Sequence, residues 1–350
     1  MKTLFDPVQL GAFALPNRII MAPLTRCRAS AGRVPNALMA EYYRQRANAG
    51  LIITEATSVT PQGVGYPNTP GIWNDAQVAG WKLTTDAVHK AGGRIILQLW
   101  HVGRISHPMY LDGELPVSAS AIAPKGHVSL VRPETAYVTP RALAREELAG
   151  IVEAYRKGAE NAKKAGFDGV EIHGANGYLL DQFLQSSTNQ RTDDYGGSVE
   201  NRARLMLEVA DAVISVWGAD RVGMHLAPRC DAHDMGDADP LATFSWVASE
   251  LGKRGIAFLF TREHYNAPGI TPALKKAFGG PVIVNEQLTV EKSEELLNTG
   301  VGDAVSFGRW YIANPDLVPR LRARAELNPL NPATLYAEGS LGYTDYPAMA

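Results

Sequence analysis

Hydrophobic and polar positions divide this chain into two kinds of segment, which follow one another along most of its length. Short apolar runs rich in β-branched residues alternate with longer stretches in which apolar and charged residues are mixed. The short runs are almost continuously apolar, which is typical of parallel strands covered on both faces. The runs that we predict to be strands are residues 18–24, 51–57, 94–100, 169–175, 222–228, 257–263, 281–285 and 303–308.

The mixed stretches between these runs have the periodicity of amphipathic helices. Residues 75–91 form one of them, and residues 146–165 form another, with Leu148, Ile151 and Tyr155 at helical spacing. Eight alternating β and α units favour an α/β fold of the (β/α)₈ TIM-barrel type over an open doubly wound sheet. The GxGxxG fingerprint of a dinucleotide-binding Rossmann domain is missing after the first run.

Two segments fall outside the repeat. Residues 4–17 resemble a short hairpin, which we expect to cover the bottom of the barrel as an N-terminal lid. Residues 104–140 follow the third strand and are rich in Pro, Ser and Gly, so we expect a capping excursion over the carboxyl ends of the strands. No sign of a second domain appears, and residues 1–350 are predicted to form a single barrel domain.

Composition and charge exclude several classes of function. The formal net charge of −2 gives no global reason to bind nucleic acid or an anionic membrane. No run of about 18 apolar residues predicts a membrane span, and the N-terminus lacks the apolar core of a secretory signal. The two cysteines, Cys27 and Cys230, fit a reduced cytoplasm and cannot supply the four thiolates of an iron–sulfur cluster. We therefore expect a cytoplasmic protein without a metal site.

Polar residues gather where the predicted strands end. In a TIM barrel these ends meet on one face, which carries the active site. The residues concerned are Thr25, Arg26, Glu55, Gln98, His101, His173, Asn176, Tyr178, His225, Arg229 and Arg309.

His173, Asn176 and Tyr178 suggest the most specific chemistry. An imidazole N–H and an amide N–H can point at one ligand oxygen and polarise it. A tyrosine two residues further on can then deliver a proton to a neighbouring carbon. A core histidine, an Asn-Gly turn and a packing tyrosine would explain the same three positions without any catalysis.

The end of the eighth predicted strand suggests a phosphate site. Gly308 and Arg309 follow it, and phosphates in TIM barrels commonly bind after the last two strands. A surface salt bridge is the alternative role for Arg309. Four aromatic residues are candidates for the wall of a pocket that binds a flat ligand, and ordinary core or surface packing is their alternative role. These residues are Tyr66, Trp100, Tyr336 and Tyr343.

Several long, irregular runs make the chain recognisable as a whole. It resembles the Old Yellow Enzyme family of FMN-dependent ene reductases over about residues 4–347, and within it the bacterial branch of xenobiotic, nitrate-ester and N-ethylmaleimide reductases. The runs that carry the resemblance are LPNRIIMAPLTR (15–26), AGLIITEAT (49–57), LQLWHVGR (97–104), AGFDGVEIHGANGYLLDQFL (165–184), STNQRTDDYGGSVENRARL (187–205), FGRWYIANPDL (307–317) and GYTDYP (342–347).

The resemblance implies a bound FMN and assigns residues to it. Thr25 would contact the flavin O4 edge, and Gly308 and Arg309 would hold the phosphate. The full set of FMN-binding residues implied in this way is Pro23, Leu24, Thr25, Ala56, Gln98, His225, Gly308 and Arg309.

The resemblance also implies a reaction. NADPH or NADH would reduce FMN, and flavin N5 would then deliver hydride to an activated alkene while Tyr178 adds the proton. His173 and Asn176 would hold the substrate's carbonyl or nitro oxygen, and Tyr66 and Trp100 would shape the pocket. Enones, maleimides and nitroalkenes are the implied substrates, with nitrate esters and nitroaromatics as further possibilities.

The chain departs from the family pattern at two places. His225 stands where many relatives have an arginine beside flavin N1, so a titratable charge would make the flavin potential depend on pH between 6 and 8; Arg229 is the alternative source of that charge. Glu286 lies in the loop after the seventh strand, where a carboxylate would repel a phosphate unless it points away.

Three alternative functions are compatible with a barrel of this kind. A related branch with an iron–sulfur cluster and a second cofactor domain is disfavoured by the cysteine content. A cofactor-free barrel enzyme would need a Schiff-base lysine or a metal cluster at a strand end, and the sequence offers neither. A flavin-binding barrel without turnover stays open, and so does the choice between monomer and homodimer.

Overall fold

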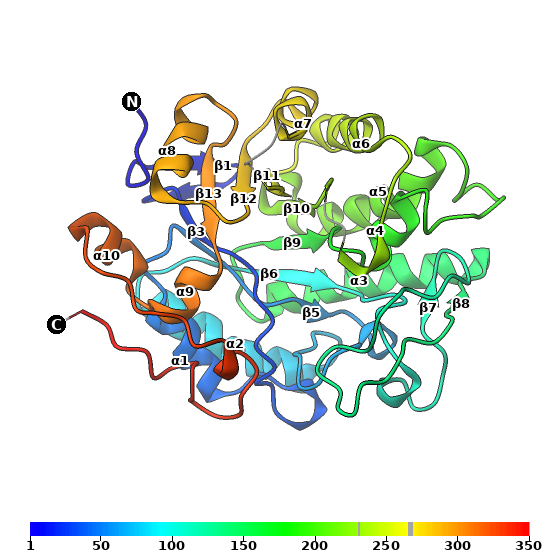
Figure 1. The fold of residues 1–350 in the computed structure, drawn as a ribbon, viewed down its shortest axis with the longest axis horizontal. Coiled ribbons are helices and arrows are strands. Elements are labelled where there is room, and N and C mark those ends of the chain that lie inside the picture. Colours follow the sequence, from blue (N-terminus) through cyan, green and yellow to red (C-terminus); the bar gives the residue numbers. More distant parts are fainter. Residues whose placement is uncertain (230–231, 265–268, 350) are drawn as a thin grey trace.

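A closed ring of parallel strands forms the centre of the molecule (Figure 1). The computed structural model describes residues 1–229, 232–264 and 269–349. Within these ranges each barrel strand pairs with two neighbours, and the ring closes where β3 pairs with both β13 and β4. The eight barrel strands are β3 (Ile19–Met21), β4 (Leu51–Ile53), β6 (Ile95–Trp100), β9 (Val170–His173), β10 (Val222–Leu226), β11 (Phe258–Arg262), β12 (Val282–Asn285) and β13 (Ala304–Phe307). The (β/α)₈ prediction is confirmed, and every strand lies inside its predicted range.

Two strands, β3 and β4, end three and four residues earlier than the apolar pattern predicts, and the other strands end within two residues of their predicted limits. The strand predicted over 18–24 ends at Met21, because Pro23 has no N–H for the ladder. The strand predicted over 51–57 ends at Ile53, and the backbone N–H of Gln98 donates instead to the Thr54 hydroxyl at 3.1 Å. A short strand, β5 (Thr57–Ser58), then resumes the pairing with β6. Thr54 still donates its backbone N–H to Ile96 at 3.0 Å, so residues 55 and 56 are the ones that leave the ladder at the carboxyl end of the barrel.

Helices form the outer layer around the ring. The predicted helices at 75–91 and 146–165 are α2 and α3, and α2 begins with a capping box between Asn74 and Gln77. Gly166, just after α3, has φ +85°, a conformation that glycine adopts without strain. The helices are α1 (Ala37–Gln45), α2 (Asp75–Lys90), α3 (Leu148–Lys164), α4 (Leu179–Leu184), α5 (Val199–Trp217), α6 (Pro240–Arg254), α7 (Thr271–Phe278), α8 (Val290–Asn298), α9 (Arg309–Ala313) and α10 (Leu317–Ala323).

The N-terminal hairpin closes one end of the barrel, as predicted. It consists of β1 (Val8–Leu10) and β2 (Phe13–Leu15), joined by a tight turn in which Gly11 has φ +55°. A Cβ atom at Gly11 would lie 2.3 Å from the carbonyl oxygen of Asp220, so only glycine fits this approach. The buried hairpin side chains share one apolar cluster with residues of the barrel strands; these are Leu10, Phe13, Leu15, Ile20, Ala22, Leu51, Ile53, Ile96, Ala257, Phe258, Phe260, Ile283 and Ala304.

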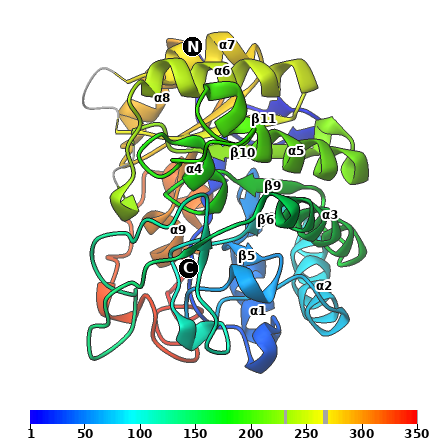
Figure 2. The same cartoon turned by 90° about the vertical axis from the view of Figure 1, so that its right-hand side faces the viewer.

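The excursion after β6 and the C-terminal segment lie on the same side of the molecule. Figure 2 shows the chain between β6 and α3, in cyan to green, near the C-terminal residues in red. The excursion contains β7 (Val117–Ser118), which pairs in parallel with β8 (Arg141–Ala142), and a bridge between His127 and Ala136. Within the described ranges, no helix is long and apolar enough to cross a membrane.

Buried arginines hold the C-terminal segment against the barrel. Arg28 donates to the carbonyl oxygens of Thr334, Leu335 and Leu341 at 2.7–3.0 Å. Arg26 donates to the Gly342 carbonyl at 2.6 Å. Five guanidinium N–H donors per arginine allow one side chain to fix several turns of irregular backbone. These contacts place the tail beside the carboxyl ends of the strands.

Candidate active site

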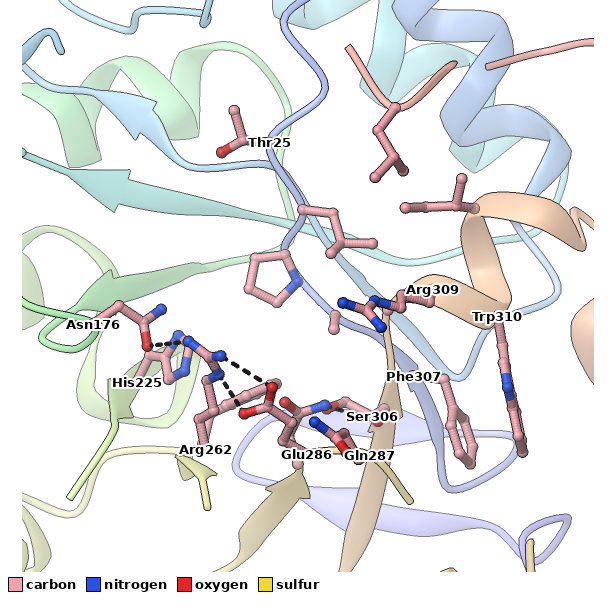
Figure 3. Close-up of a pocket in the computed structure, with 18 of the residues that line it drawn as sticks. Thr25, Asn176, His225, Arg262, Glu286, Gln287, Ser306, Phe307, Arg309 and Trp310 are labelled. Carbon is pink, nitrogen blue, oxygen red and sulfur yellow. Dashed lines mark hydrogen bonds and ion pairs between the residues drawn. The ribbon is translucent and has the colours of Figure 1, made fainter. Parts of the chain in front are cut away.

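A cavity of about 970 Å³ opens at the carboxyl ends of the barrel strands (Figure 3). It runs from the turn after β9, through the ends of β10 and β11, to the loop after β12 and the start of α9. A smaller cavity of about 90 Å³ adjoins it and shares Pro23, Thr25, Asn176, Tyr178 and His225 with it. The site is therefore elongated, with one end at Asn176 and Tyr178 and the other at Arg309.

Every residue to which the family resemblance assigns a role in catalysis, FMN binding or substrate binding lines one of these two cavities. The excursion after β6 contributes Ser129 and Leu130, and the C-terminal segment contributes Tyr336. The prediction that the excursion covers this face is confirmed. The predicted residues that line the cavities are Pro23, Leu24, Thr25, Ala56, Tyr66, Gln98, Trp100, His173, Asn176, Tyr178, His225, Gly308 and Arg309.

Two parallel imidazole rings lie on adjacent strands. His173 ends β9 and His225 lies opposite it on β10; their ring centroids are 5.1 Å apart with an angle of 6° between the planes. Burial, with a further contribution from the positive charge of Arg262, lowers the pKa of His173 to about 3. Burial also lowers the pKa of His225 well below its usual value. Both rings are therefore neutral at pH 7 and can each donate one N–H.

A buried polar chain lies behind these rings. Gln98 donates from Nε2 to Glu171 at 2.6 Å, and the same nitrogen lies 3.3 Å from Nδ1 of His225. Because an amide nitrogen only donates, Nδ1 of His225 accepts and its proton resides on Nε2. Burial raises the pKa of Glu171 to about 8, so this carboxyl group is mostly protonated at pH 7. Nε2 of His225 has no hydrogen-bond partner among the described residues and can donate to a ligand.

Two tyrosine hydroxyls meet at the other side of His173. The Tyr66 and Tyr178 oxygens are 2.8 Å apart, and the Tyr178 ring lies edge-on to His173 and Trp100. Burial raises the pKa of both hydroxyls, whereas their mutual hydrogen bond lowers the pKa of Tyr178 and raises that of Tyr66. Either hydroxyl can donate in this bond, and when Tyr66 donates, the Tyr178 proton is available to a ligand.

The opposite end of the cavity contains a cation. Arg309 begins α9 and points into the cavity in Figure 3. Ion pairing with a carboxylate, the alternative role for this residue, is not found for Arg309 in the described part of the chain. Gly308 lies against Leu24, whose side chain would be 3.1 Å from a Cβ at that position. This end can accept a phosphate group through charge and close backbone approach.

The structure resolves the unfavourable position predicted for Glu286. Its carboxylate accepts two hydrogen bonds from Arg262, at 2.7 and 3.0 Å, and so carries no unpaired charge (Figure 3). Arg262 also donates to the side-chain oxygen of Asn176 at 3.0 Å. Neither contact was predicted, because Arg262 lies at the end of β11 with no sequence motif around it.

Two sequence-based expectations need correction, and for Tyr343 the structure selects the core role over the role in the cavity wall. His225 was expected to titrate between pH 6 and 8, but its burial keeps the ring neutral there. Arg229, the alternative source of charge, is exposed and lines neither cavity, whereas Arg262, beside His225 in the cavity lining, does. Tyr343 is not a cavity wall, because it is buried against Tyr42 with ring centroids 4.0 Å apart.

Several further cavity residues were missed by the sequence reasoning. One is Phe260, which packs against His225 at 4.4 Å between ring centroids. His233 lines neither cavity but supports the site, because its Nδ1 donates to the Asn176 carbonyl oxygen at 2.7 Å. One sequence signal could have identified Arg262, namely that a polar residue stands at the end of each predicted strand. Cys27 is buried and forms no disulfide, whereas Cys230 lies outside the described residues. No cluster of metal-ligating residues is found within the described ranges.

The dimensions and donors of the cavity fit FMN. Two buried imidazole nitrogens have no hydrogen-bond partner among the described residues: Nδ1 of His173 and Nε2 of His225. They are available to form hydrogen bonds with the polar atoms of a flat heteroaromatic ring or with a substrate bound beside that ring. Pro23, Thr25 and Gln98 form the wall next to them. Arg309 supplies a cation at the opposite end of the cavity, where it can bind the phosphate of FMN.

Residues 3–328 match the model of a family described as the NADH:flavin oxidoreductase / NADH oxidase family. Among curated relatives, a probable flavin mononucleotide-dependent alkene reductase of Leishmania infantum is 44% identical, with 100% of this chain and 98% of the relative covered. The 12-oxophytodienoate reductase 7 of Oryza sativa subsp. japonica is 42% identical, with 98% and 94% covered.

Solved structures agree with this likeness. Morphinone reductase in complex with tetrahydroNAD superposes with a TM-score of 0.96 and 48% identity, covering 100% of this chain and 98% of the other. The Old Yellow Enzyme homologue of Zymomonas mobilis superposes with a TM-score of 0.97 and 44% identity, covering 99% and 100%. The similarity thus extends over the barrel, the excursion and the C-terminal segment alike.

Proposed function

The chain belongs to the NADH:flavin oxidoreductase / NADH oxidase family, and we propose that it is an FMN-dependent alkene reductase driven by NADPH or NADH. The observation that carries this proposal is the placement of His173, Asn176 and Tyr178 on one wall of the cavity, with the first neutral and the last protonated. The relatives named as alkene and 12-oxophytodienoate reductases support the same reaction class.

The residues assigned to FMN divide between the two ends of the cavity. Thr25, Gln98 and His225 would bond the ring, with Pro23, Leu24 and Ala56 packing beside it. Gly308 and Arg309 would hold the phosphate. Bound FMN would supply the hydride transfer between the nicotinamide and the alkene. The protein would contribute position, hydrogen bonds and the exclusion of water by the excursion after β6.

The substrate side of the reaction rests on two donors and one acid. The neutral His173 ring and the Asn176 amide would donate to a carbonyl or nitro oxygen, which withdraws electrons from the conjugated double bond. Tyr178 Oη would hold the proton that adds to the α-carbon, and Tyr66 would stabilise the oxygen left behind by its donated hydrogen bond. A charged His173 would donate equally well, but its burial disfavours that form.

The substrate range is a finer part of the proposal. One acceptor oxygen conjugated to a double bond is what the site would recognise, as in enones, maleimides and nitroalkenes. Nitrate esters and nitroaromatics, the substrates of the bacterial xenobiotic-reductase branch, present similar oxygens. The relatives reported above include plant and protozoan proteins, so membership of that bacterial branch is part of the proposal.

The remaining expectations belong to the same proposal. The chain would act as a single FMN-binding domain, as monomer or homodimer, in the cytoplasm and without a nucleic-acid or membrane partner. The morphinone reductase structure contains tetrahydroNAD, a nicotinamide analogue, which supports NADH as a donor to be tested beside NADPH.

Anaerobic stopped-flow absorbance tests the proposal directly. The FMN-loaded protein is mixed first with NADPH or NADH, and then with 2-cyclohexenone or N-ethylmaleimide. Bleaching of the flavin band by the nucleotide and its recovery by the alkene are the expected results. Bleaching without recovery would redirect the search to nitrate esters and nitro compounds, and a protein that takes up no FMN would favour a cofactor-free barrel.

A further inference from the structure

The backbone of Asn176 is fixed from two sides. This residue has φ +58° in the turn between β9 and α4. Its carbonyl oxygen accepts from Nδ1 of His233 at 2.7 Å, and the N–H of Gly177 donates to Asp181 at 2.8 Å. A left-handed turn of this kind suits an Asn-Gly pair. The turn therefore sets where the Asn176 side chain starts, but not which way its amide faces.

Arg262 determines the orientation of that amide. Its Nη1 lies 3.0 Å from the side-chain oxygen of Asn176. A guanidinium group has donors only, so the atom that faces it must be the carboxamide oxygen and not the nitrogen. Figure 3 shows the contact from Arg262 ending on the oxygen of Asn176, with none drawn to its amide nitrogen. The amide nitrogen is thereby left to donate to a ligand in the cavities that Asn176 lines.

Glu286 holds Arg262 in this place. The carboxylate accepts from Nε at 2.7 Å and from Nη2 at 3.0 Å, a two-point contact that restricts rotation of the guanidinium. The partners are brought together by the sheet, because Arg262 on β11 is in register with Asn285 on β12. Both side chains are partly buried, with 30% and 22% of their surfaces exposed.

We propose that Arg262 is a positioning residue for the substrate site: it aims the Asn176 amide at the substrate oxygen, and Glu286 anchors it. This inference rests on the proposed function, in which Asn176 donates to that oxygen. The arrangement links the loop at the phosphate end of the cavity with the donor at the substrate end. The same positive charge lies close enough to contribute to the low pKa of His173 and His225, which keeps both rings neutral.

A double-mutant cycle on the FMN-loaded protein tests this role. The probe is 4-chlorophenol, which offers one acceptor oxygen and no double bond that this reaction reduces, and its dissociation constant is measured from the change in flavin absorbance. Arg262→Met and Asn176→Ala are each expected to weaken binding about tenfold, the value of one well-placed hydrogen bond. In the Asn176→Ala background, Arg262→Met is expected to have no further effect.

Two results would overturn the inference. Unchanged affinity in Arg262→Met would show that the amide is aimed without the arginine. An equal tenfold loss in both backgrounds would show that Arg262 acts on the ligand through its own charge. Failure of the proposed function is recognised separately, because the wild-type protein would then bind no FMN or show no recovery with any alkene.

Two further variants provide an alternative test and a matched control. Glu286→Gln keeps the shape of the anchor and one acceptor, and is expected to weaken 4-chlorophenol binding about threefold, again only when Asn176 is present. It carries the test if Arg262→Met does not fold. Arg254→Met removes a comparable two-point ion pair with Asp211, at the C-terminal end of α6, and is expected to leave both FMN content and phenol affinity unchanged.

Discussion

The two ends of the barrel interior have opposite chemistry, although the same strands build both. At the hairpin end the inward side chains are apolar, as at Ile96 on β6 and Phe258 on β11. Two and four residues further along, the same faces carry Gln98 and Arg262. Because side chains alternate with a period of two, one strand can pass from core to active site without any change of fold.

The polar end is the costlier one to bury. Polar atoms of Trp100, Glu171, His173 and His225 have no hydrogen-bond partner among the described residues. A buried polar atom left unpaired lowers stability by about 1–3 kcal/mol. The hairpin end, with its continuous apolar cluster, offsets this cost. The apolar end therefore stabilises the fold, whereas the polar end lowers its stability and carries the chemistry. Mutations at the two ends should accordingly have separable effects.

The largest expected effect is on chemistry at the polar end. Tyr178→Phe removes the proposed acid while keeping the ring, and should slow the alkene-dependent recovery of the flavin about a thousandfold. FMN content and bleaching by NADPH should stay as in the wild type. Stopped-flow absorbance measures both steps. Tyr155→Phe, which removes a buried hydroxyl without a partner in the described structure, is the control; a wild-type rate in Tyr178→Phe would assign the proton to another group.

A mutation at the hairpin end should affect stability alone. The Phe13 ring lies against Gly169, where a Cβ would come within 2.6 Å of it. Phe13→Ala should lower the free energy of unfolding by about 3 to 5 kcal/mol, the cost of a large core cavity. Urea unfolding measures the loss, and Phe13→Leu should show a smaller one. The separation of the two ends would be disproved by a slower alkene step in folded Phe13→Ala protein.

The free energy of unfolding should depend on pH through Glu171, which lies on β9 between the two ends. Unfolded protein releases the Glu171 proton near the ordinary pKa, whereas the buried carboxyl group keeps it until about pH 8. Between these values the folded state binds more protons, so stability falls as pH rises. Glu171→Gln cannot titrate and should lose less stability between pH 5 and pH 8, by on the order of 2 to 3 kcal/mol.

Urea midpoints of the FMN-free protein at both pH values provide this measurement. Glu114→Gln, on an exposed segment, is the matched control and should follow the wild type. Equal pH dependence in Glu171→Gln and wild type would mean that Glu171 releases its proton at the same pH in the folded and the unfolded protein.

The smallest expected effect concerns the phosphate end of the cavity. Arg309→Met should weaken FMN binding about tenfold, since one charge-assisted contact is lost while the ring contacts remain. Fluorescence titration of the FMN-free protein measures the affinity, and added salt should weaken the wild type more than the variant. Arg229→Met changes an exposed arginine outside the cavity and should bind FMN normally. The reverse result would place the phosphate near Arg229.

Much of the fold was predictable because its signals are local. The near-continuous apolar runs predicted all eight barrel strands, and the polar residues at their ends predicted which face of the barrel carries the cavity. Each of these patterns follows from the alternation of side chains along one strand. The strand limits at Met21 and Ile53 were less predictable, because they depend on a missing proline N–H and on the Thr54 hydroxyl.

The sequence by itself thus determined the order of strands and helices, the hairpin and excursion, and the residue types offered to the cavity. Only the tertiary structure decided their partners. Arg262 meets Glu286 and Asn176 because three strands converge, and Tyr343 is buried because arginines fix the tail. The neutrality of His225 likewise comes from its surroundings. Periodicity is set by neighbours along the chain, whereas charge state and pairing depend on groups that only folding brings within a few ångströms.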